Sequence, residues 1–361
     1  MTDWIATLPS DIRPFVSQLS GLPDFAERLA ALALILHQRQ HEKDAVSREL
    51  ARRAWELAPQ NPRVRRAVEW AVRRSVPNWH FFIVRDLGRN EAYERALKQL
   101  VTADSVVLEI GTGTGLLAMM AARAGARHVY SCEMEPLAAL AAAENIARNG
   151  YAERVTVISK KSTELAVGED IPAPADLLVS EIVSDSLLGE DLLPTMEDAL
   201  TRLVKPGAPV IPDDAAVLGA LIGDAPWAMG NRLGVVSGFD LSAFDRLAPM
   251  VISPDVNALT LDEALSDEVE LFRFDFSRPA HYPAETKEIS IAIRCDGLAR
   301  GFLQWNWLGL ASGIEYDNRP PADTNWNPLF YVFPESIPVR AGDTLRLMVE
   351  HDRKSITIWP V

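Results

Sequence analysis

The chain has 361 residues, of which 48% are hydrophobic, and a formal net charge of −14. A chain of this length can bury a large core and is expected to form two domains rather than one. Because phosphate contacts require a basic surface, the acidic balance disfavours a nucleic-acid partner and suits a cationic ligand. The two cysteines and six histidines show no metal-ligand spacing, so we expect neither a disulfide framework nor a metal site.

The N-terminal segment M-T-D-W-I-A-T-L-P lacks the basic start of a signal peptide. The longest early apolar run, Leu29 to Leu36, is too short to cross a bilayer. We therefore expect a cytoplasmic protein with no membrane partner.

Residues 1–75 are predicted to form about three helices, because apolar residues recur at helical spacing in 25–38 and 45–57 and P-Q-N-P at 59–62 ends the pattern. The segment A-R-R-A-W-E-L-A-P-Q-N-P-R-V resembles part of a tetratricopeptide repeat, but no second copy follows at a period of about 34 residues. Two interpretations remain for this extension: a helical cap packed on the next domain, or a partner-binding module.

From residue 105 the pattern alternates between short β-rich apolar runs and helical stretches. Strands are expected at V-V-L-E-I, H-V-Y-S-C-E, V-T-V-I and D-L-L-V-S-E, with one helix ending near Arg123 and another at 136–149. This order predicts a parallel sheet with crossover helices. Residues 76–211 are therefore interpreted as a Rossmann-like, cofactor-binding domain of an α/β protein.

Residues 212–361 have few helix signals, and β-type runs dominate. Several strands at turn-punctuated spacing predict an antiparallel β-barrel or sandwich that begins near residue 212. The expected strands are 215–222, 270–276, 288–294, 301–308, 329–332, 345–349 and 356–359.

The segment E-I-G-T-G-T-G, Glu109 to Gly115, lies between the first predicted strand and its helix. Gly111, Gly113 and Gly115 allow a tight turn and a close approach of the backbone to a ligand. A lone glycine-rich loop is weak evidence, because nicotinamide dinucleotide enzymes share it. The G-x-G-x-G spacing, with Glu109 two places upstream, favours S-adenosylmethionine over a dinucleotide.

Glu133 ends the second predicted strand, where a carboxylate can accept hydrogen bonds from both hydroxyls of a ribose. This position favours a cofactor that contains adenosine. The alternative interpretation of Glu133 is a surface acid beside Glu135.

The segment S-E-I-V-S-D-S-L-L-G-E, Ser180 to Glu190, holds Glu181 and Glu190 nine positions apart at the end of an apolar strand. Two carboxylates can hold one cation by charge-assisted hydrogen bonds, and guanidinium offers a planar fork for them. The pair therefore predicts a guanidinium substrate. The alternative interpretation of Glu190 is a helix-capping acid in L-G-E-D.

Over about residues 78–361 the chain resembles the protein arginine methyltransferases, and within them the type III, monomethylating branch. Five motifs in order carry this resemblance: W-H-F-F-I-V-R-D-L-G-R-N-E-A-Y at 79–93, V-L-E-I-G-T-G-T-G-L-L, K-S-T-E at 161–164, S-E-I-V-S-D-S-L-L-G-E, and T-N-W at 324–326. The resemblance implies S-adenosylmethionine as cofactor, with Arg89 pairing with its methionine carboxylate and Ser162 and Thr163 lining its adenine. It also implies that Glu181 and Glu190 grip the substrate arginine.

The substrate side departs from the family pattern. Asn325 replaces the usual histidine of T-H-W, and Asp86 stands where that histidine has its carboxylate partner, so a hydrogen bond remains but no charged dyad. Asp185 and the bulk of Val183 resemble the monomethylating branch and imply monomethylarginine as product. Trp326 is expected either to wall the substrate channel or to fill the barrel core.

In this family the barrel carries an arm that docks on the cofactor domain of a second subunit. This implies a head-to-tail homodimer, with the arm near residues 224–255. The expected substrate is arginine in a protein or peptide, and the alternative is free arginine or another small guanidino compound, with the N-terminal helices covering the cleft. A non-catalytic, cofactor-sensing or partner-binding protein is the alternative from another class, and only Asn325 supports it.

Overall fold

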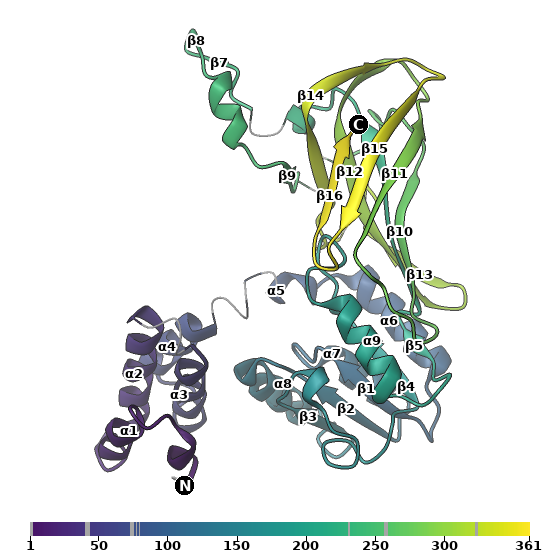
Figure 1. Ribbon diagram of the computed structural model, residues 1–361. Helices are drawn as coiled ribbons and strands as arrows, with labels where there is room; N and C mark the ends of the chain where they lie inside the picture. Colours follow the sequence, from purple (N-terminus) through teal and green to yellow (C-terminus); the bar gives the residue numbers. More distant parts are fainter. Residues whose placement is uncertain are drawn as a thin grey trace.

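The computed structural model has a helical unit, a parallel α/β unit and an antiparallel β unit in chain order (Figure 1). This is the predicted fold class. The structure describes residues 3–39, 44–72, 76, 78, 80–229, 232–255, 259–321 and 324–361. Within these parts, no helix has the length and apolar character that a membrane crossing requires.

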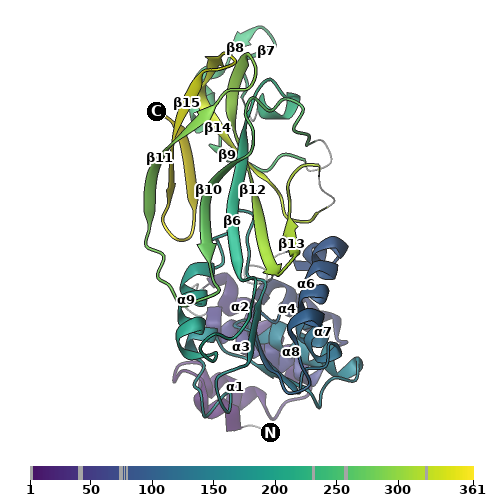
Figure 2. The ribbon, with the colours of Figure 1, turned by 90° about the vertical axis from the view of Figure 1, so that its right-hand side faces the viewer.

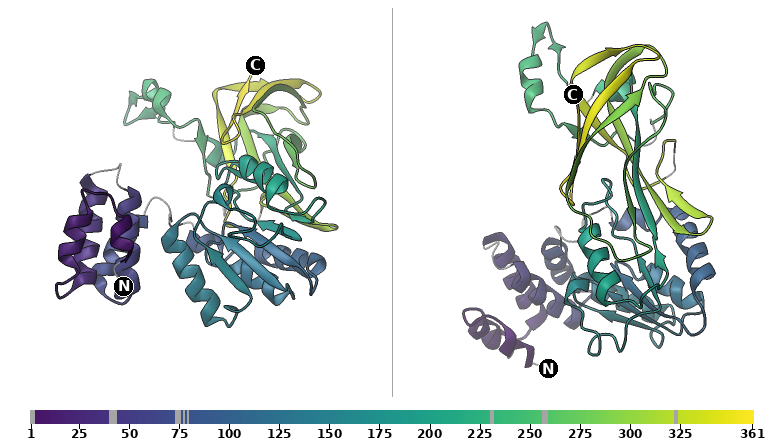
Figure 3. Two further views of the ribbon diagram at one scale, coloured as in Figure 1. Left: turned by 60° about the horizontal axis from the view of Figure 1, so that its bottom comes forward. Right: turned by 45° about the vertical axis from the view of Figure 1, so that its right-hand side comes forward.

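The helical unit packs around a small apolar core of its own. Asn61 accepts a hydrogen bond from the Arg63 N–H at 2.9 Å, and Pro62 provides the preset φ angle favoured at the start of its last helix. Figure 3 shows the unit beside the helices of the α/β unit. Its elements are the 3₁₀ helix η1 (Asp3–Thr7), α1 (Arg13–Leu19), α2 (Phe25–Arg39), α3 (Asp44–Leu57) and α4 (Pro62–Val72).

The α/β unit is built on a five-stranded parallel sheet of order β3-β2-β1-β4-β5. Its strands form at the predicted apolar runs because helices cover both faces of the sheet. The central strands β1 and β4 are buried almost throughout, while the edge strand β3 is only partly buried. The strands are β1 (Val106–Ile110), β2 (His128–Cys132), β3 (Val155–Ile158), β4 (Leu177–Ser180) and β5 (Val210–Ile211). The helical elements are α5 (His80–Ile83), α6 (Leu87–Leu100), α7 (Leu116–Arg123), α8 (Pro136–Arg148), η3 (Ser162–Glu164) and α9 (Leu192–Arg202).

The β unit consists of two antiparallel sheets that share one apolar core and stand on the α/β unit (Figure 2). One has the order β10-β6-β12-β14-β9, with β13 also paired to β12, and the other the order β11-β15-β16. The strands are β6 (Asp214–Ile222), β9 (Val251–Ile252), β10 (Val269–Asp275), β11 (Glu285–Ala292), β12 (Gly297–Ala311), β13 (Ile314–Asp317), β14 (Leu329–Val339), β15 (Thr344–His351) and β16 (Ile356–Pro360).

A separate projection leaves the β unit between β6 and β9 (Figure 1). η4 (Pro226–Met229) still packs on the β unit, where the ring of Trp227 meets that of Phe330 edge to face. The projection itself comprises β7 (Val235–Val236), β8 (Phe239–Asp240) and η5 (Ser242–Leu247). These elements lie within the segment 224–255 that the sequence predicts as an arm, of which residues 230 and 231 lie outside the described residues. The docking role of this segment stays a prediction.

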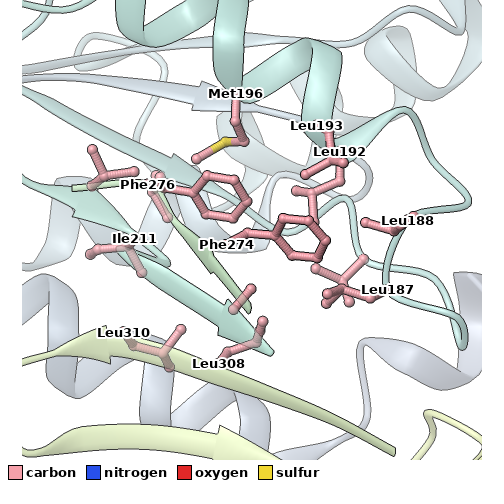
Figure 4. Packing of buried hydrophobic residues seen from close by; sticks show 14 of the residues in the cluster. Leu187, Leu188, Leu192, Leu193, Met196, Ile211, Phe274, Phe276, Leu308 and Leu310 are labelled. Carbon is pink, nitrogen blue, oxygen red and sulfur yellow. The ribbon is translucent and has the colours of Figure 1, made fainter. Parts of the chain in front are cut away.

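An apolar cluster joins the α/β unit to the β unit (Figure 4). Leu187 and Leu188 belong to the loop after β4. They are buried in the same core as Phe274, which lies in β10, and Phe276, which directly follows that strand. The loop that carries Glu190 is therefore anchored, because its own buried leucines pack in a core that both units share.

Candidate active site

A cavity of about 650 Å³ lies at the carboxyl ends of β1, β2 and β4. This edge is where open parallel sheets bind ligands. Of the residues predicted from the sequence, the cavity is lined by Arg89, Glu109, Gly111, Gly113, Glu133, Ser162, Glu181 and Glu190. The others are not among the described residues that line it, namely Asp86, Gly115, Thr163, Asp185, Asn325 and Trp326.

The glycine-rich loop takes a backbone path that other residues rarely adopt. Gly111, Gly113 and Gly115 have φ values of +89°, +51° and +84°. A Cβ atom at Gly111 would lie 2.7 Å from the Cγ2 atom of Ile182, which is too close. The loop thus needs glycine both for its conformation and for its contact with the segment after β4.

Glu109 is buried at the end of β1 and accepts a hydrogen bond from the Ser131 hydroxyl on neighbouring β2. Burial raises the pKa of Glu109 to about 8, although this hydrogen bond opposes the shift. Glu109 thus lines the cavity as a buried acid that holds its proton more readily than an exposed one.

Glu133 directly follows β2 and is fixed by two backbone donors. Its Oε2 atom accepts from the Gly113 N–H at 3.0 Å, and its Oε1 atom accepts from the Glu135 N–H at 2.8 Å. Each carboxylate oxygen retains a further acceptor site, so this group is placed to accept hydrogen bonds from two hydroxyls. Ser162 lines the cavity beyond β3, whereas Thr163 is exposed and outside the lining.

Arg89 and Glu181 meet inside the cavity. The Arg89 Nη1 atom lies 2.8 Å from the Glu181 Oε2 atom, and their side chains are 4% and 16% exposed. Burial raises the pKa of Glu181 to about 8 against the opposing charge of Arg89, and Glu190 and Asp86 add to the shift. Arg89 thus neutralises part of an acidic cluster.

Glu190 lies in the loop before α9 and faces the same cavity. Burial raises its pKa to about 7, with further contributions from the charges of Glu133 and Asp185. The next residue, Asp191, has a φ of +58° and pairs with Lys161 at 3.3 Å and with Lys354 of the β15–β16 turn at 2.9 Å. The pair with Lys354 joins the two units beside Glu190.

Asp86 connects the start of α6 to the β unit. Its Oδ1 atom caps α6 by accepting from the Arg89 N–H at 2.9 Å. Its Oδ2 atom accepts from the Tyr316 hydroxyl, the Thr324 hydroxyl at 3.0 Å and the Asn325 N–H at 3.1 Å. Asn325 therefore reaches Asp86 through its backbone, and its side chain is exposed.

Asp185 and Trp326 are held by contacts outside the cavity lining. Asp185 accepts hydrogen bonds from the backbone N–H and side-chain amide of Asn327 at 2.9 and 3.3 Å, and burial raises its pKa despite them. Trp326 is buried with its ring 5.3 Å from that of Tyr316, in the shared core. Val183 is also buried in this core.

Sequence reasoning missed several residues that hold this site, among them Arg48, Tyr316, Asn327 and Lys354. Thr324 belongs to the T-N-W motif, which was the available signal for this region. Asn327 directly follows that motif, whereas Arg48, Tyr316 and Lys354 come from a helix, a strand and a turn where no local spacing marks them. In the described residues, no group of three or more His, Cys, Asp or Glu is arranged to hold a metal ion.

Comparison of the sequence with known proteins gives consistent relatives. The family model of ribosomal protein L11 methyltransferase (PrmA) matches residues 94–212. An arginine N(omega)-methyltransferase of Streptomyces achromogenes subsp. streptozoticus is 37% identical over 277 residues, which cover 76% of each chain. Protein arginine N-methyltransferase 7 of Danio rerio is 30% identical over 80% of this chain and 48% of its own length. The chain thus spans about half of that second relative.

Solved structures show the same fold. The Trypanosoma brucei PRMT1 enzyme-prozyme heterotetrameric complex with AdoHcy aligns with a TM-score of 0.68 and 24% identity, over 78% of this chain and 92% of the matched chain. The crystal structure of PRMT6-SAH aligns with a TM-score of 0.60 and 21% identity, over 77% and 97% of the two chains.

Proposed function

The chain belongs to the protein arginine N-methyltransferase family and is an S-adenosylmethionine-dependent arginine N-methyltransferase, and we propose that it places a single methyl group on arginine in proteins or peptides. The observation that carries the proposal is the meeting of Glu181 and Glu190 in one cavity with the glycine-rich loop and Glu133. The two carboxylates of Glu181 and Glu190 suit a guanidinium, and the glycine-rich loop with Glu133 suits a cofactor that contains adenosine.

The residues present fit this cofactor. Glu133 offers two fixed carboxylate oxygens for ribose hydroxyls, and the positive-φ glycines allow a ligand to approach the backbone. Arg89 supplies a buried guanidinium for a carboxylate. When bound, S-adenosylmethionine supplies an electrophilic methyl group on a sulfonium.

Two carboxylates solve the main difficulty of arginine chemistry. A guanidinium is protonated and delocalised, so its nitrogens are poor nucleophiles. Glu181 and Glu190, gripping two edges, draw the charge towards the bound nitrogens and orient the free one. Methylation forms a new N–C bond as the bond from sulfur to the methyl breaks, and its electron pair stays on sulfur, which leaves as the neutral thioether of S-adenosylhomocysteine. The extra proton on the methylated nitrogen is taken up by one of the two glutamates, directly or through water.

Labelled methyl transfer tests this function with an arginine-rich peptide, free arginine and a lysine peptide as acceptors. We expect label in the arginine-rich peptide alone. Glu181→Gln and Glu190→Gln should each lower kcat by at least about 100-fold while the variants still bind S-adenosylmethionine, because each keeps its shape and loses its charge. Full rates in both Gln variants would refute the guanidinium clamp.

A free guanidino compound is the second candidate substrate. It is favoured by the Streptomyces relative, which is called an arginine N(omega)-methyltransferase. The helical unit also contributes Arg48 to the cavity wall, which fits a cleft covered on that side. Label in free arginine and none in the peptide would replace the peptide proposal with this one.

The single methylation rests on Asp185. Asp185 does not line the cavity, but its charge contributes to the raised pKa of Glu190, which supports placing a third acid close to the proposed guanidinium site. An extra acid there restricts the space and the hydrogen bonding available to an already methylated nitrogen. Mass spectrometry of early product should show monomethylarginine, and abundant dimethylarginine would contradict the proposal.

The assembly proposed for the enzyme is a head-to-tail homodimer. The projection between β6 and β9 exposes large apolar side chains, including Phe239 and Leu247. The α/β unit exposes Phe81, Phe82 and Leu87 on α5 and α6. Apolar surfaces of this kind favour a protein partner, and a second copy of the chain supplies both surfaces.

A further inference from the structure

We propose that Arg48 of the helical unit belongs to the cofactor site and binds the adenosine part of S-adenosylmethionine, so that the N-terminal extension completes this site. The proposal rests on the function inferred above. It assigns to the extension a direct role in cofactor affinity rather than a role as a separate binding module.

Arg48 stands on α3, yet it lines the same cavity as Glu133 and Glu181. Its Nε atom lies 3.4 Å from the Oε2 atom of Glu135, and its side chain is 31% exposed. Glu135 is the N-cap of α8, where it accepts a hydrogen bond from the Leu137 N–H. Arg48 thus reaches from the extension to the turn that follows β2.

The extension is anchored at this place. Leu137 of α8 is buried and packs in the apolar core of the helical unit. Next to Arg48 in sequence, Ser47 is fully buried and donates a hydrogen bond to the Ala33 carbonyl on α2 at 2.8 Å. Arg48 therefore projects from a fixed part of its helix, and an ordered side chain there costs little additional conformational entropy on binding.

The strand order locates Arg48 along the cofactor. Along the carboxyl edge of the sheet, the strands stand in the order β4, β1, β2 and β3. They are followed in turn by Glu181, the glycine-rich loop, Glu133 and Ser162, all of which line the cavity. The reacting methyl must lie beside Glu181, and the ribose beside Glu133, so the adenosine extends towards β2 and β3. Arg48 lies at this end, because its partner Glu135 follows Glu133 by two residues.

The chemistry of Arg48 suits both parts of an adenosine. Its pairing with Glu135 neutralises one of two neighbouring carboxylates and holds the turn whose backbone N–H fixes Glu133. A guanidinium has five donors and a planar face, so the groups that do not meet Glu135 can donate to ribose oxygens or lie against a purine.

Isothermal titration calorimetry tests the proposal on the full chain with two probes, S-adenosylmethionine and 5′-methylthioadenosine. The second probe keeps the adenosine and lacks the amino-acid part. Arg48→Ala should raise the Kd of both probes by about tenfold, the effect of losing one charge-assisted contact. Arg89→Lys should weaken S-adenosylmethionine and leave 5′-methylthioadenosine within twofold. Unchanged affinity of both probes for Arg48→Ala, or a loss confined to S-adenosylmethionine, would overturn the proposal.

Arg52→Ala is the matched control, because Arg52 lies on the same helix, pairs with Glu49 and Glu56 and does not line the cavity. Its Kd values should equal those of the wild type, and an equal loss there would also overturn the proposal. Arg48→Gln replaces Arg48→Ala if thermal melting shows that the alanine variant is unfolded. If the wild-type chain binds no S-adenosylmethionine, the proposed function is contradicted. If the wild-type chain binds the cofactor and methylates, and Arg48→Ala has the same Kd values as the wild type, only this inference is contradicted.

Discussion

Arg89 and Glu181 form a buried ion pair, 2.8 Å from Nη1 to Oε2, that joins α6 to the end of β4. The same guanidinium donates to the Asn90 side chain at 3.0 Å. The family resemblance assigns Arg89 to the methionine carboxylate of the cofactor. Because a guanidinium has a fork of five donors, it can serve this carboxylate and Glu181 together, and so connect cofactor binding to the substrate clamp.

Arg89→Lys tests this connection. Lysine keeps the charge but cannot donate to two carboxylates with fork geometry, so both contacts should weaken. We expect the Kd of S-adenosylmethionine to rise about 10- to 100-fold and kcat to fall as well, measured by calorimetry and initial rates. A rise in Kd with an unchanged kcat would show that Arg89 serves the cofactor alone.

Proton release should accompany ligand binding near neutral pH. The pKa of Glu190 is raised to about 7 and that of Glu181 to about 8, so both are partly protonated at pH 7 in the unliganded protein. A sulfonium or guanidinium beside them favours the charged carboxylates and lowers both pKa values. Calorimetry at pH 7.5 in buffers of different ionisation enthalpy should show a release of up to about one proton.

The same reasoning gives the pH dependence of catalysis. The ionised glutamates are the active forms, so kcat/KM for the acceptor should rise between pH 6 and 8.5. Glu190→Gln should release fewer protons on binding than the wild type. Proton uptake, or a rate that falls over this range, would contradict the assignment of these two acids.

The sequence identified residues that line the cavity, but not the residues that hold Asp86 and Asp185 in place. Glu133, Glu181 and Glu190 follow strand ends or lie in one loop, and local spacing is enough to mark such positions. Tyr316 and Asn327 reach Asp86 and Asp185 across more than a hundred residues of chain. Contacts of this kind arise from how β13 and the segment before β14 meet the α/β unit, and no periodic pattern records them.

Asn325→His restores the residue usual in the family and tests whether Asp86 is free to pair with it. The Oδ2 atom of Asp86 already accepts from Tyr316, Thr324 and the Asn325 N–H. A new imidazole should therefore change kcat/KM by less than about threefold and add no pH limb near 6.5. Tyr316→Phe is the companion variant and should cost about 1–2 kcal/mol of stability, because it removes a buried donor from Asp86.

Strand limits in the β unit show a second gap between sequence and structure. The run 329–332 was predicted as a strand, but β14 continues to Val339 through Pro334 and Pro338. Proline lacks the N–H that donates in a sheet ladder, so a prediction from local residue types ends the strand before it. β12 likewise extends to both sides of its predicted run, past a bulge between Ala299 and Gly301. Pairing with neighbouring strands maintains both strands where local signals fade.

Glu109 should make the stability of the protein fall as pH rises. Its pKa is about 8 when folded and near 4.5 when unfolded, so its contribution is fully present below about pH 4.5 and is lost as pH rises through 8. Glu109→Gln keeps an acceptor for Ser131 and removes this titration. Between pH 5 and 8.5 the variant should gain about 1–3 kcal/mol relative to the wild type, measured by melting or urea unfolding. An identical pH dependence of the two proteins would show that Glu109 is ionised in the folded state.

The projection between β6 and β9 should control assembly. Phe239 and Leu247 are 71% and 73% exposed, more than a monomeric surface favours for such large apolar groups. We expect a dimer at micromolar concentration by light scattering, and a monomer for the double variant Phe239→Asp/Leu247→Asp, because a charge in an apolar interface must lose its water.

Phe15→Asp is the control for that change, since Phe15 is 61% exposed on α1 and lies outside the projection. It should leave the dimer intact. Phe82→Asp on α5 should break the dimer as Phe239→Asp/Leu247→Asp does. The reason is that a head-to-tail contact joins the projection of one copy to the α/β unit of the other. If Phe82→Asp stays dimeric while Phe239→Asp/Leu247→Asp is monomeric, the projection does not dock on α5, and the proposed head-to-tail contact is wrong.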